Sequence, residues 1–355
     1  MSATGVARSR GYYQSIGTPV ETVVGLEKVS QRLRDLGYTK LEHLIHGSQV
    51  AHRDLSDFLQ IDDGDLDTLI MAASSSAITI PQATLDKILA AKYGLGFAIE
   101  AFSSGPPSSS GYASPPPEGL PPDVVLIDEM GPIRDQGTRG TCVAHAAVAL
   151  LEQHLKRADS YKDLSEQFSY WNCKQSDGIP HISGTWLGVA MPLMERVGCC
   201  LEVTWPYNSV PDPTNHGQGP PPEGAQLEAL GFRPGIVKQL PPTSLLEIKS
   251  ELNERRAVAF SIPIFDSWVR SSWVAYSGEI TVPAPGEAMT GGHAMCLVGY
   301  FDLPTPEEPN GGRFLVRNSW GETWGSGCPY GRGYGAIPYS YVEKFCMEAY
   351  TIANR

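Results

Sequence analysis

The sequence predicts an α+β protein with two segregated halves and a cleft between them, preceded by a small all-helical bundle. Three observations support this prediction. Apolar residues recur at helical spacing in residues 21–101, and residues 103–122 hold 16 Ser, Gly or Pro in 20 positions. After this run, an apolar helical segment precedes several short β-branched segments, so helices come first and strands later.

The first predicted unit, residues 21–101, is a bundle of short helices that follows a flexible N-terminus over residues 1–20. Its apolar residues keep a helical period until Gly37 interrupts the pattern. The further helices expected here cover residues 41–47 behind a Thr39 cap, 65–73 behind Asp62 or Asp63, and 83–93. This succession of helices and glycine turns resembles helix-hairpin-helix and SAM-like bundles, some of which bind DNA while others self-associate.

The second predicted unit begins after a linker. Residues 102–122 are expected to be semi-extended, because Pro, Ser and Gly bury little surface and proline stiffens the chain. Residues 123–355 are long enough to form a core of their own. The elements predicted in this unit are helices at 142–157 and 244–254 and strands at 257–264, 294–300 and 313–317.

Charge and composition narrow the classes of partner. The chain has 355 residues and a formal charge of −12, which argues against nucleic acid or an anionic membrane as a main partner. Residues 1–100 carry 9 Lys or Arg against 12 Asp or Glu. The bundle is therefore expected to contact a protein or a second copy rather than DNA, with a partnerless helical cap as the alternative. No stretch has 18 apolar residues and no signal segment is readable, so a cytoplasmic chain with mostly reduced thiols is expected.

The strongest chemical signal is a cysteine at the start of a predicted helix. Gln136 is followed six residues later by Cys142, which opens the apolar helical run. Unpaired N–H groups and the positive end of the helix dipole favour a thiolate at such a position. Because the thiolate is the reactive form, Cys142 is a candidate nucleophile.

Two later motifs supply candidate partners for this cysteine. His293 begins an apolar strand in the motif Gly-Gly-His-Ala, and Asn318 follows another strand in Asn-Ser-Trp-Gly. An Asn carbonyl oxygen can hold an imidazole N–H, and the indole of Trp320 can shield that hydrogen bond from water. His145, one turn after Cys142 on the same helix, is the weaker candidate, because two side chains of one helix seldom face a substrate together.

The ordered set Gln-x5-Cys, Gly-His-Ala and Asn-Ser-Trp-Gly resembles the papain-like cysteine peptidases, a C1-type family, over residues 123–355. Smaller motifs of the family occur in order between the large ones: Leu164-Ser165-Glu166-Gln167, Ser183-Gly184, Trp205-Pro206-Tyr207 and Tyr276-Ser277-Gly278-Glu279-Ile280. The resemblance implies a papain-like fold with a helical half, a β-barrel-like half and a cleft between them.

The resemblance also implies roles for individual residues. It makes Cys142 the nucleophile, His293 the acid and base, and Asn318 the group that orients His293. It places the oxyanion hole at Gln136 and the backbone N–H of Cys142. The residues it places in the substrate site are Ser183, Gly184, Gly292, Ala294 and Trp320. It implies no cofactor, and no Cys/His spacing in the chain suggests a metal site.

Several positions depart from the family pattern. Arg139 replaces the family's second cysteine, so the usual disulfide cannot form and a cation is expected near the thiolate. Val143 replaces a tryptophan, and His145 is interpreted as a buried structural imidazole. Cys173 lacks its expected partner after Tyr207, although Cys199 or Cys200 could replace it, and free thiols are expected. The usual helical prodomain signature is not visible in residues 1–101.

The resulting hypothesis is a cysteine endopeptidase that acts on a peptide or protein through a thioester acyl-enzyme. A catalytically silent papain-like binding scaffold and an acyl transferase to amines are the alternatives. The linker at 103–122 is long enough to lie in the cleft, where its prolines would lose little entropy on ordering. The full chain is therefore expected to be latent until the linker is cut or the helical bundle moves.

Overall fold

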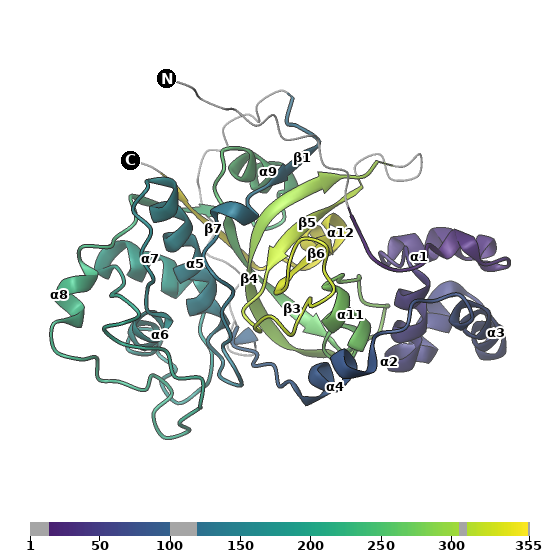
Figure 1. Ribbon diagram of the computed structural model, residues 1–355, viewed down its shortest axis with the longest axis horizontal. Coiled ribbons are helices and arrows are strands. Elements are labelled where there is room, and N and C mark those ends of the chain that lie inside the picture. The colour runs from purple at the N-terminus through teal and green to yellow at the C-terminus, as the bar shows by residue number, and fades with distance from the viewer. Residues whose placement is uncertain (1–13, 100–118, 305–310, 354–355) are drawn as a thin grey trace.

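The computed structural model describes residues 14–99, 119–304 and 311–353. Its centre is an antiparallel seven-stranded sheet with the strand order β2-β7-β3-β4-β5-β6, and β1 pairs with β4 (Figure 1). The strands are β1 (Asp123–Val125), β2 (Ile236–Leu240), β3 (Val258–Phe265), β4 (Met289–Asp302), β5 (Gly312–Arg317), β6 (Tyr334–Pro338) and β7 (Glu348–Ala353). The architecture is α+β, as the sequence predicts.

The long strand β4 organises the sheet and carries a predicted site residue near its start. It pairs with β3 so that His293 lies opposite Ile262. Its register against β5 shifts between Leu297 and Gly299, which marks a bulge. A Cβ on Gly299 would overlap the Val124 carbonyl oxygen, so the close approach of β1 requires glycine there.

The helices α5 (Cys142–Arg157), α6 (Glu166–Lys174), α7 (Leu187–Val197) and α8 (Ala225–Ala229) form the helical half on one side of the sheet (Figure 1). Helix α5 is buried along most of its length, which its Ala- and Leu-rich sequence permits. Helix α6 is capped by Ser165, whose hydroxyl accepts from the Phe168 N–H. The predicted helix at 244–254 is α9 (Leu245–Asn253), with Ser244 as its cap.

Short helices surround the β-rich half. They are the 3₁₀ turn η4 (Ile127–Glu129), α10 (Asp266–Val269), α11 (Ser272–Ser277) and α12 (Tyr339–Phe345). The first two residues of the motif Tyr276–Ile280 are the last two of α11. Gly278 terminates this helix with φ +72°, in the left-handed region that favours glycine.

The N-terminal region is helical, although its boundaries differ from the prediction. Its elements are η1 (Val20–Thr22), η2 (Leu26–Lys28), α1 (Ser30–Asp35), α2 (Leu41–Leu59), α3 (Asp63–Ser74) and α4 (Gln82–Ala90). Gly47 does not end a helix, because α2 continues to Leu59 through a kink at Ala51. Lys40, not Thr39, is its N-cap residue. A Cβ on Gly47 would overlap the Tyr38 ring, so packing, not termination, explains this glycine.

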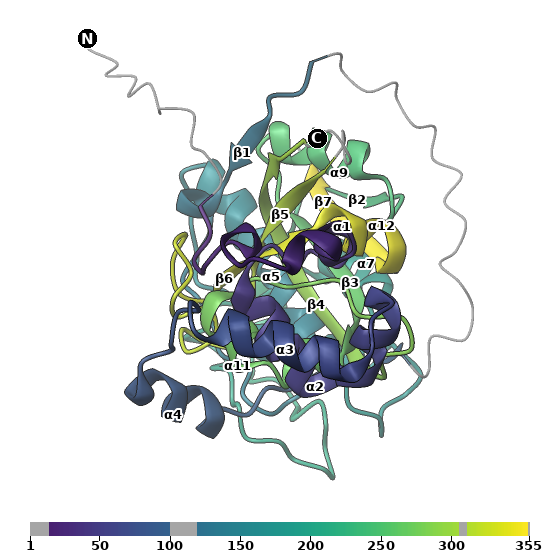
Figure 2. The same ribbon diagram turned by 90° about the vertical axis from the view of Figure 1, so that its right-hand side faces the viewer.

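The helices α1 and α2 dock on the β-rich half and share an apolar core with it (Figure 2). Polar contacts cross the same interface. Arg313 of β5 donates to the carbonyl oxygens of Gly37, at 2.9 Å, and Ile280, at 3.1 Å. His43 Nε2 of α2 lies 3.4 Å from Glu279 Oε2. These contacts make the helices a packed part of the molecule. Among the described residues, none of the helices is long and apolar enough to span a membrane.

Candidate active site

Three predicted residues meet where the two halves of the fold join. Cys142 is the first residue of α5, and its Sγ accepts the backbone N–H of Ala294 at 3.3 Å. His293 therefore lies on β4 beside the start of α5. Asn318 follows β5, and its Oδ1 lies 2.8 Å from His293 Nε2. This bond leaves Nδ1 as the other nitrogen of the ring, and Nδ1 has no hydrogen bond among the described residues.

Tryptophans enclose the bond between His293 and Asn318. The Trp320 ring stacks on the imidazole with centroids 4.5 Å apart and an angle of 27°. Trp268 of α10 meets the same imidazole edge-on at 6.3 Å. These rings exclude water, which strengthens the hydrogen bond and fixes the orientation of the imidazole.

Gln136 lies beside this group with its amide held on both sides. Its Oε1 accepts from the Ser319 hydroxyl at 2.7 Å, so its Nε2 is the donor, and Nε2 donates to the Arg139 carbonyl oxygen at 2.7 Å. The second Nε2 bond, at 3.0 Å, goes to the carbonyl oxygen of Gly94. The sequence analysis did not single out Ser319, although it stands inside the Asn-Ser-Trp-Gly motif.

A segment of the N-terminal region covers the site. After α4 the chain runs along the lower edge of the molecule toward α5 (Figure 1). The Phe97 N–H donates to the Gly292 carbonyl oxygen at 3.2 Å. Thr185 donates to the Gly96 carbonyl oxygen at 3.0 Å and accepts from the Ala98 N–H at 3.3 Å. Residues 93–98, called here the cleft segment, thus bridge the two walls, and Cys142 and His293 have no exposed surface.

Two glycines allow the cleft segment to approach this closely. A Cβ on Gly94 would overlap the Arg139 carbonyl oxygen, and one on Gly96 would overlap the backbone of Gly140. Tyr93 stacks on Trp320 with centroids 4.7 Å apart. The chain nearest the sulfur is therefore almost bare backbone.

The prediction that the linker lies in the cleft concerns residues 103–122. Residues 103–118 lie outside the described residues, and the described end of the linker lies elsewhere. Pro121 and Pro122 accept hydrogen bonds from Tyr300 and Asp302, at the opposite end of β4 from His293. The segment that occupies the cleft precedes the linker in sequence.

Burial under the cleft segment changes the protonation of the site. It raises the pKa of the Cys142 thiol to about 12, although backbone N–H groups such as those of Ala294 and Gly96 oppose the change. It lowers the pKa of His293 to about 4 against the effect of the Asn318 hydrogen bond. Burial thus favours the neutral form of both groups, in contrast to the thiolate that the sequence analysis favours at a helix start.

The predicted substrate residues line the same space. A Cβ on Gly184 would lie 2.6 Å from the Gly96 carbonyl oxygen, and Ser183 is its neighbour. Gly292 faces Phe97, and Ala294 contacts the sulfur. Trp320 also donates through Nε1 to the Gly94 carbonyl oxygen at 3.0 Å.

The expectation that Arg139 places a cation near the thiolate is wrong. Its guanidinium turns away and donates to Gln167 Oε1 at 2.7 Å and to the carbonyl oxygens of Asn208 and His216. The backbone carbonyl, not the charge, faces the site. The seven cysteines are free thiols.

His145 is a buried imidazole, as predicted. Its Nδ1 lies 3.0 Å from the Thr141 carbonyl oxygen, and the Tyr207 ring packs against it edge to face. Burial lowers its pKa to about 3, which keeps the ring neutral.

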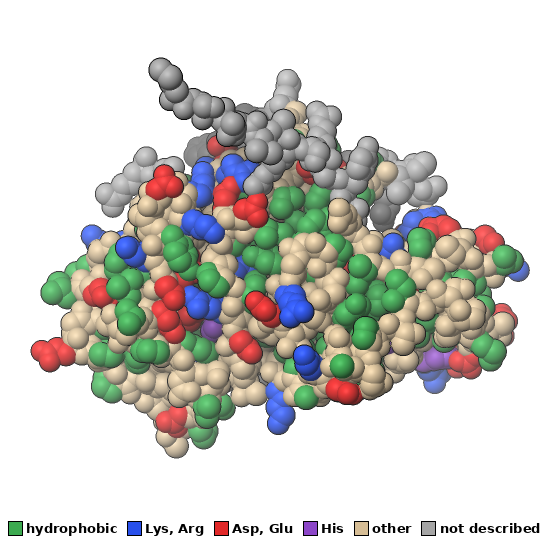
Figure 3. Space-filling view, viewed as in Figure 1, with side chains coloured by type: hydrophobic (Ala, Val, Ile, Leu, Met, Phe, Trp, Pro, Cys, Tyr) green, Lys and Arg blue, Asp and Glu red, His purple; other side chains and the backbone are tan. Residues whose placement is uncertain are grey.

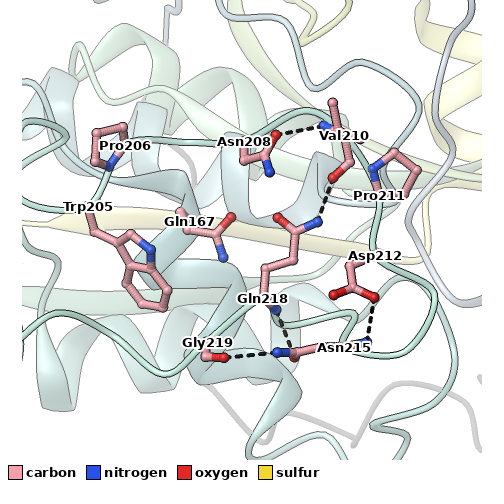
Figure 4. A pocket seen from close by; sticks show the side chains of 10 residues that line it. All are labelled: Gln167, Trp205, Pro206, Asn208, Val210, Pro211, Asp212, Asn215, Gln218 and Gly219. Atoms are coloured by element: carbon pink, nitrogen blue, oxygen red, sulfur yellow. Dashed lines mark hydrogen bonds between the residues drawn. The ribbon is translucent and has the colours of Figure 1, made fainter.

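An open pocket lies apart from this site, beside the loop that Arg139 holds (Figure 4). It has a volume of about 480 Å³ and includes Gln167, Trp205 and Asp212 in its lining. None of the predicted site residues lines it.

Acidic and basic side chains are mixed on the face of the molecule that Figure 3 shows. Within the described residues, no group of three or more His, Cys, Asp or Glu could hold a metal ion.

Comparisons with known proteins found relatives over part of the chain. An uncharacterized peptidase C1-like protein of Acanthamoeba polyphaga mimivirus is 30% identical over 220 residues, which are 59% of this chain and 64% of that protein. Cathepsin J of Rattus norvegicus is 29% identical over 55% of this chain and 54% of its own length. The matches therefore span between about half and two thirds of these relatives.

Solved structures show the same fold. Xylellain, a cysteine protease from Xylella fastidiosa, superposes with a TM-score of 0.62 at 22% identity, over 75% of this chain and 97% of its own. The proform of the ragweed pollen allergen Amb a 11, also a cysteine protease, has a TM-score of 0.52 at 21% identity, over 72% of each chain. The model of the papain family of cysteine proteases matches residues 125–343. With this match over more than half of its length, the chain belongs to the papain family of cysteine proteases.

Proposed function

We propose that this protein is a cysteine endopeptidase whose nucleophile is Cys142. The observation that carries the proposal is the convergence of Cys142 at a helix start with an imidazole that Asn318 holds at 2.8 Å through the other ring nitrogen. Asn318 restricts the rotation of His293, so that Nδ1 is the nitrogen left for proton transfer to and from the sulfur. Each group comes from a different element, which fixes its position by packing.

The reaction follows from these positions. The Cys142 thiolate attacks the peptide carbonyl carbon, and His293, which holds the thiol proton, gives it to the departing amine as the C–N bond breaks. A thioester remains. His293 then takes a proton from water, whose oxygen attacks the thioester carbonyl, and the proton returns to the sulfur as the C–S bond breaks.

Gln136 would stabilise the oxyanion that forms in both steps. Besides the Arg139 carbonyl oxygen, its Nε2 donates to the carbonyl oxygen of Gly94, which supports a role as donor to a substrate carbonyl oxygen. The backbone N–H of Cys142 would be the second donor. A preorganised donor of this kind contributes on the order of 3 kcal/mol to the barrier.

Replacement of the nucleophile tests the peptidase. We expect Cys142→Ala to lower peptide hydrolysis by more than about a thousandfold, because covalent catalysis is lost. The circular dichroism spectrum should not change, since a buried thiol is exchanged for a methyl group. Hydrolysis of a peptide library is measured by mass spectrometry, with Cys328→Ala as the matched control. Activity that survives in Cys142→Ala would contradict the assignment of the nucleophile.

We further propose that the full chain is latent and that the cleft segment causes this latency. Three features support the proposal. The backbone of the cleft segment pairs with Thr185 and Gly292 across the walls. The carbonyl oxygen of its Gly94 accepts a hydrogen bond from Gln136 Nε2. The cleft segment also contributes to the burial of Cys142 and His293, which disfavours the thiolate and the imidazolium. Activation then requires release of residues 93–98, by a cut in the linker or by movement of the helices that precede them.

A further inference from the structure

Lys174 is a buried cation that the reaction does not use. It ends α6 and is 3% exposed. Its Nζ donates to Asp177 Oδ2 at 2.7 Å and lies 2.8–2.9 Å from three backbone carbonyl oxygens, those of Ile179, Ile182 and Gly184. An ammonium has three N–H donors, so these four acceptors occupy all of them. A buried charge is costly unless such bonds compensate it.

These bonds organise the turn that leads to one wall of the cleft. Asp177 Oδ1 accepts the Ile179 N–H at 3.0 Å, which starts the turn. At its end, the Gly184 carbonyl oxygen accepts from Lys174 and the Gly184 N–H donates to the Tyr170 hydroxyl at 3.0 Å. Two side chains of α6, which lies behind the wall, therefore hold both the N–H and the carbonyl oxygen of Gly184.

The next residue faces the opposite way. Thr185 directs its N–H and its carbonyl oxygen to Gly96 and Ala98 of the cleft segment. Gly184, with φ +96°, and Thr185 thus direct their polar groups to opposite sides, so fixing Gly184 from behind determines how Thr185 is presented in front. Any extended peptide that replaces the cleft segment meets the same pair of groups.

We propose that Lys174 is a positioning residue for the substrate, one that holds Gly184 so that Thr185 can pair with an extended peptide in the cleft. The proposal rests on the peptidase function proposed above. Loss of the ammonium leaves the carbonyl oxygens of Ile182 and Gly184 without their donor, while that of Ile179 keeps the Ile182 N–H. The turn must then open to let water reach the buried Gly184 oxygen. Cys142, His293 and Asn318 lie on other elements, so their chemistry is unaffected.

The test compares two reagents on the full chain. Iodoacetamide is small and needs only an accessible Cys142, whereas a peptidyl epoxide must also bind along the wall. Both require release of the cleft segment, so the ratio of their rate constants cancels that step. Lys174→Met preserves the length of the side chain and removes the charge. The control is Lys162→Met, which changes an exposed lysine.

We expect the ratio of epoxide to iodoacetamide labelling at Cys142, read by peptide mapping, to fall about tenfold in Lys174→Met. The iodoacetamide rate should stay the same or rise, because the cleft segment uses the same wall. An unchanged ratio, or an equal fall of both rates, would overturn the proposal. If Lys174→Met does not fold, Asp177→Asn is used, with the same direction expected. A wild-type chain that iodoacetamide labels at Cys142 but the peptidyl epoxide never labels would overturn the peptidase itself.

Discussion

At the scale of single residues, one residue of the site transfers the proton and another orients the imidazole ring. His293 carries the proton, and Asn318 only holds the ring through Nε2. In a chain whose cleft is open, we expect His293→Ala to lower kcat by about a thousandfold and Asn318→Ala by about ten- to a hundredfold, because general acid and base catalysis contributes more than the orientation of its ring. Steady-state kinetics on one fluorogenic peptide decides this. Equal losses would contradict the division of roles.

Cys142 and Asn318 could be predicted because each stands at the end of an element, whereas His293 lies within β4 and was found through its Gly-Gly-His-Ala motif. Cys142 opens a helix, Asn318 follows a strand, and such positions are visible as changes of pattern. The direction of a side chain is not visible in that way. Arg139 has its carbonyl toward the site and its charge toward Asn208 and His216, and Lys174 reaches back to Gly184, which only tertiary contacts decide.

At the scale of elements, the sequence located the helical and strand-rich regions but not the chain that fills the cleft. Gly94 and Gly96 look like turn glycines, because sequence spacing cannot distinguish a turn from a close approach to another backbone. The same ambiguity made Gly47 look like the end of a helix, whereas it packs against Tyr38 inside α2. The composition of the proline-rich linker favoured it as the occupant of the cleft, although residues 93–98 make the contacts there.

One added methyl group is expected to displace the cleft segment. In Gly96→Ala the new Cβ would overlap the backbone of Gly140, and overpacking of this kind costs about 1–3 kcal/mol. We expect iodoacetamide to alkylate Cys142 about tenfold faster or more in the full-length variant, and peptidase activity to rise with it. Peptide mapping over time measures the rate.

Lys92→Ala is the matched control for this prediction, because Lys92 is exposed and adjoins the cleft segment. Its alkylation rate should equal that of the wild type. If Gly96→Ala reacts no faster than Lys92→Ala, the cleft segment does not limit access to the sulfur, and latency has another cause or is absent.

At the scale of the whole molecule, the sequence suggested a helical bundle on a tether, and the structure shows one packed body. Leu33 and Leu44 belong to the same apolar core as Phe314 and Ile337. Arg313 and Glu279 are buried against Gly37 and His43. Separation of the two parts would expose this core and leave buried polar groups without partners. A cut within residues 103–118 should therefore free the cleft segment at one end without separating the parts.

Acid should weaken this association. Burial lowers the pKa of His43 and of His46 in the docked form, which favours neutral rings. In the separated form the same rings would be exposed and would take up protons below about pH 6.5. Association is then favoured above that pH and lost as the pH falls. The groups that face the two rings are Glu279, Arg313, Tyr38, Glu42, Ser272, Trp273 and Gln49. Burial tends to raise the pKa of Glu279, but its contact with His43 lowers the pKa overall, which also favours docking above acidic pH.

A chain cut at a protease site introduced within residues 103–118 tests this prediction. We expect its two fragments to co-elute at pH 7.5 and to separate toward pH 5, with the dissociation constant rising about tenfold per pH unit for each imidazole that takes up a proton. His43→Gln should make this dependence shallower, and His46→Gln should do the same if the first variant does not associate at pH 7.5. His52→Gln, which changes a partly exposed ring beside Asp67, should leave it unchanged. Identical pH profiles in the wild type and both buried-histidine variants would show that these rings do not control docking.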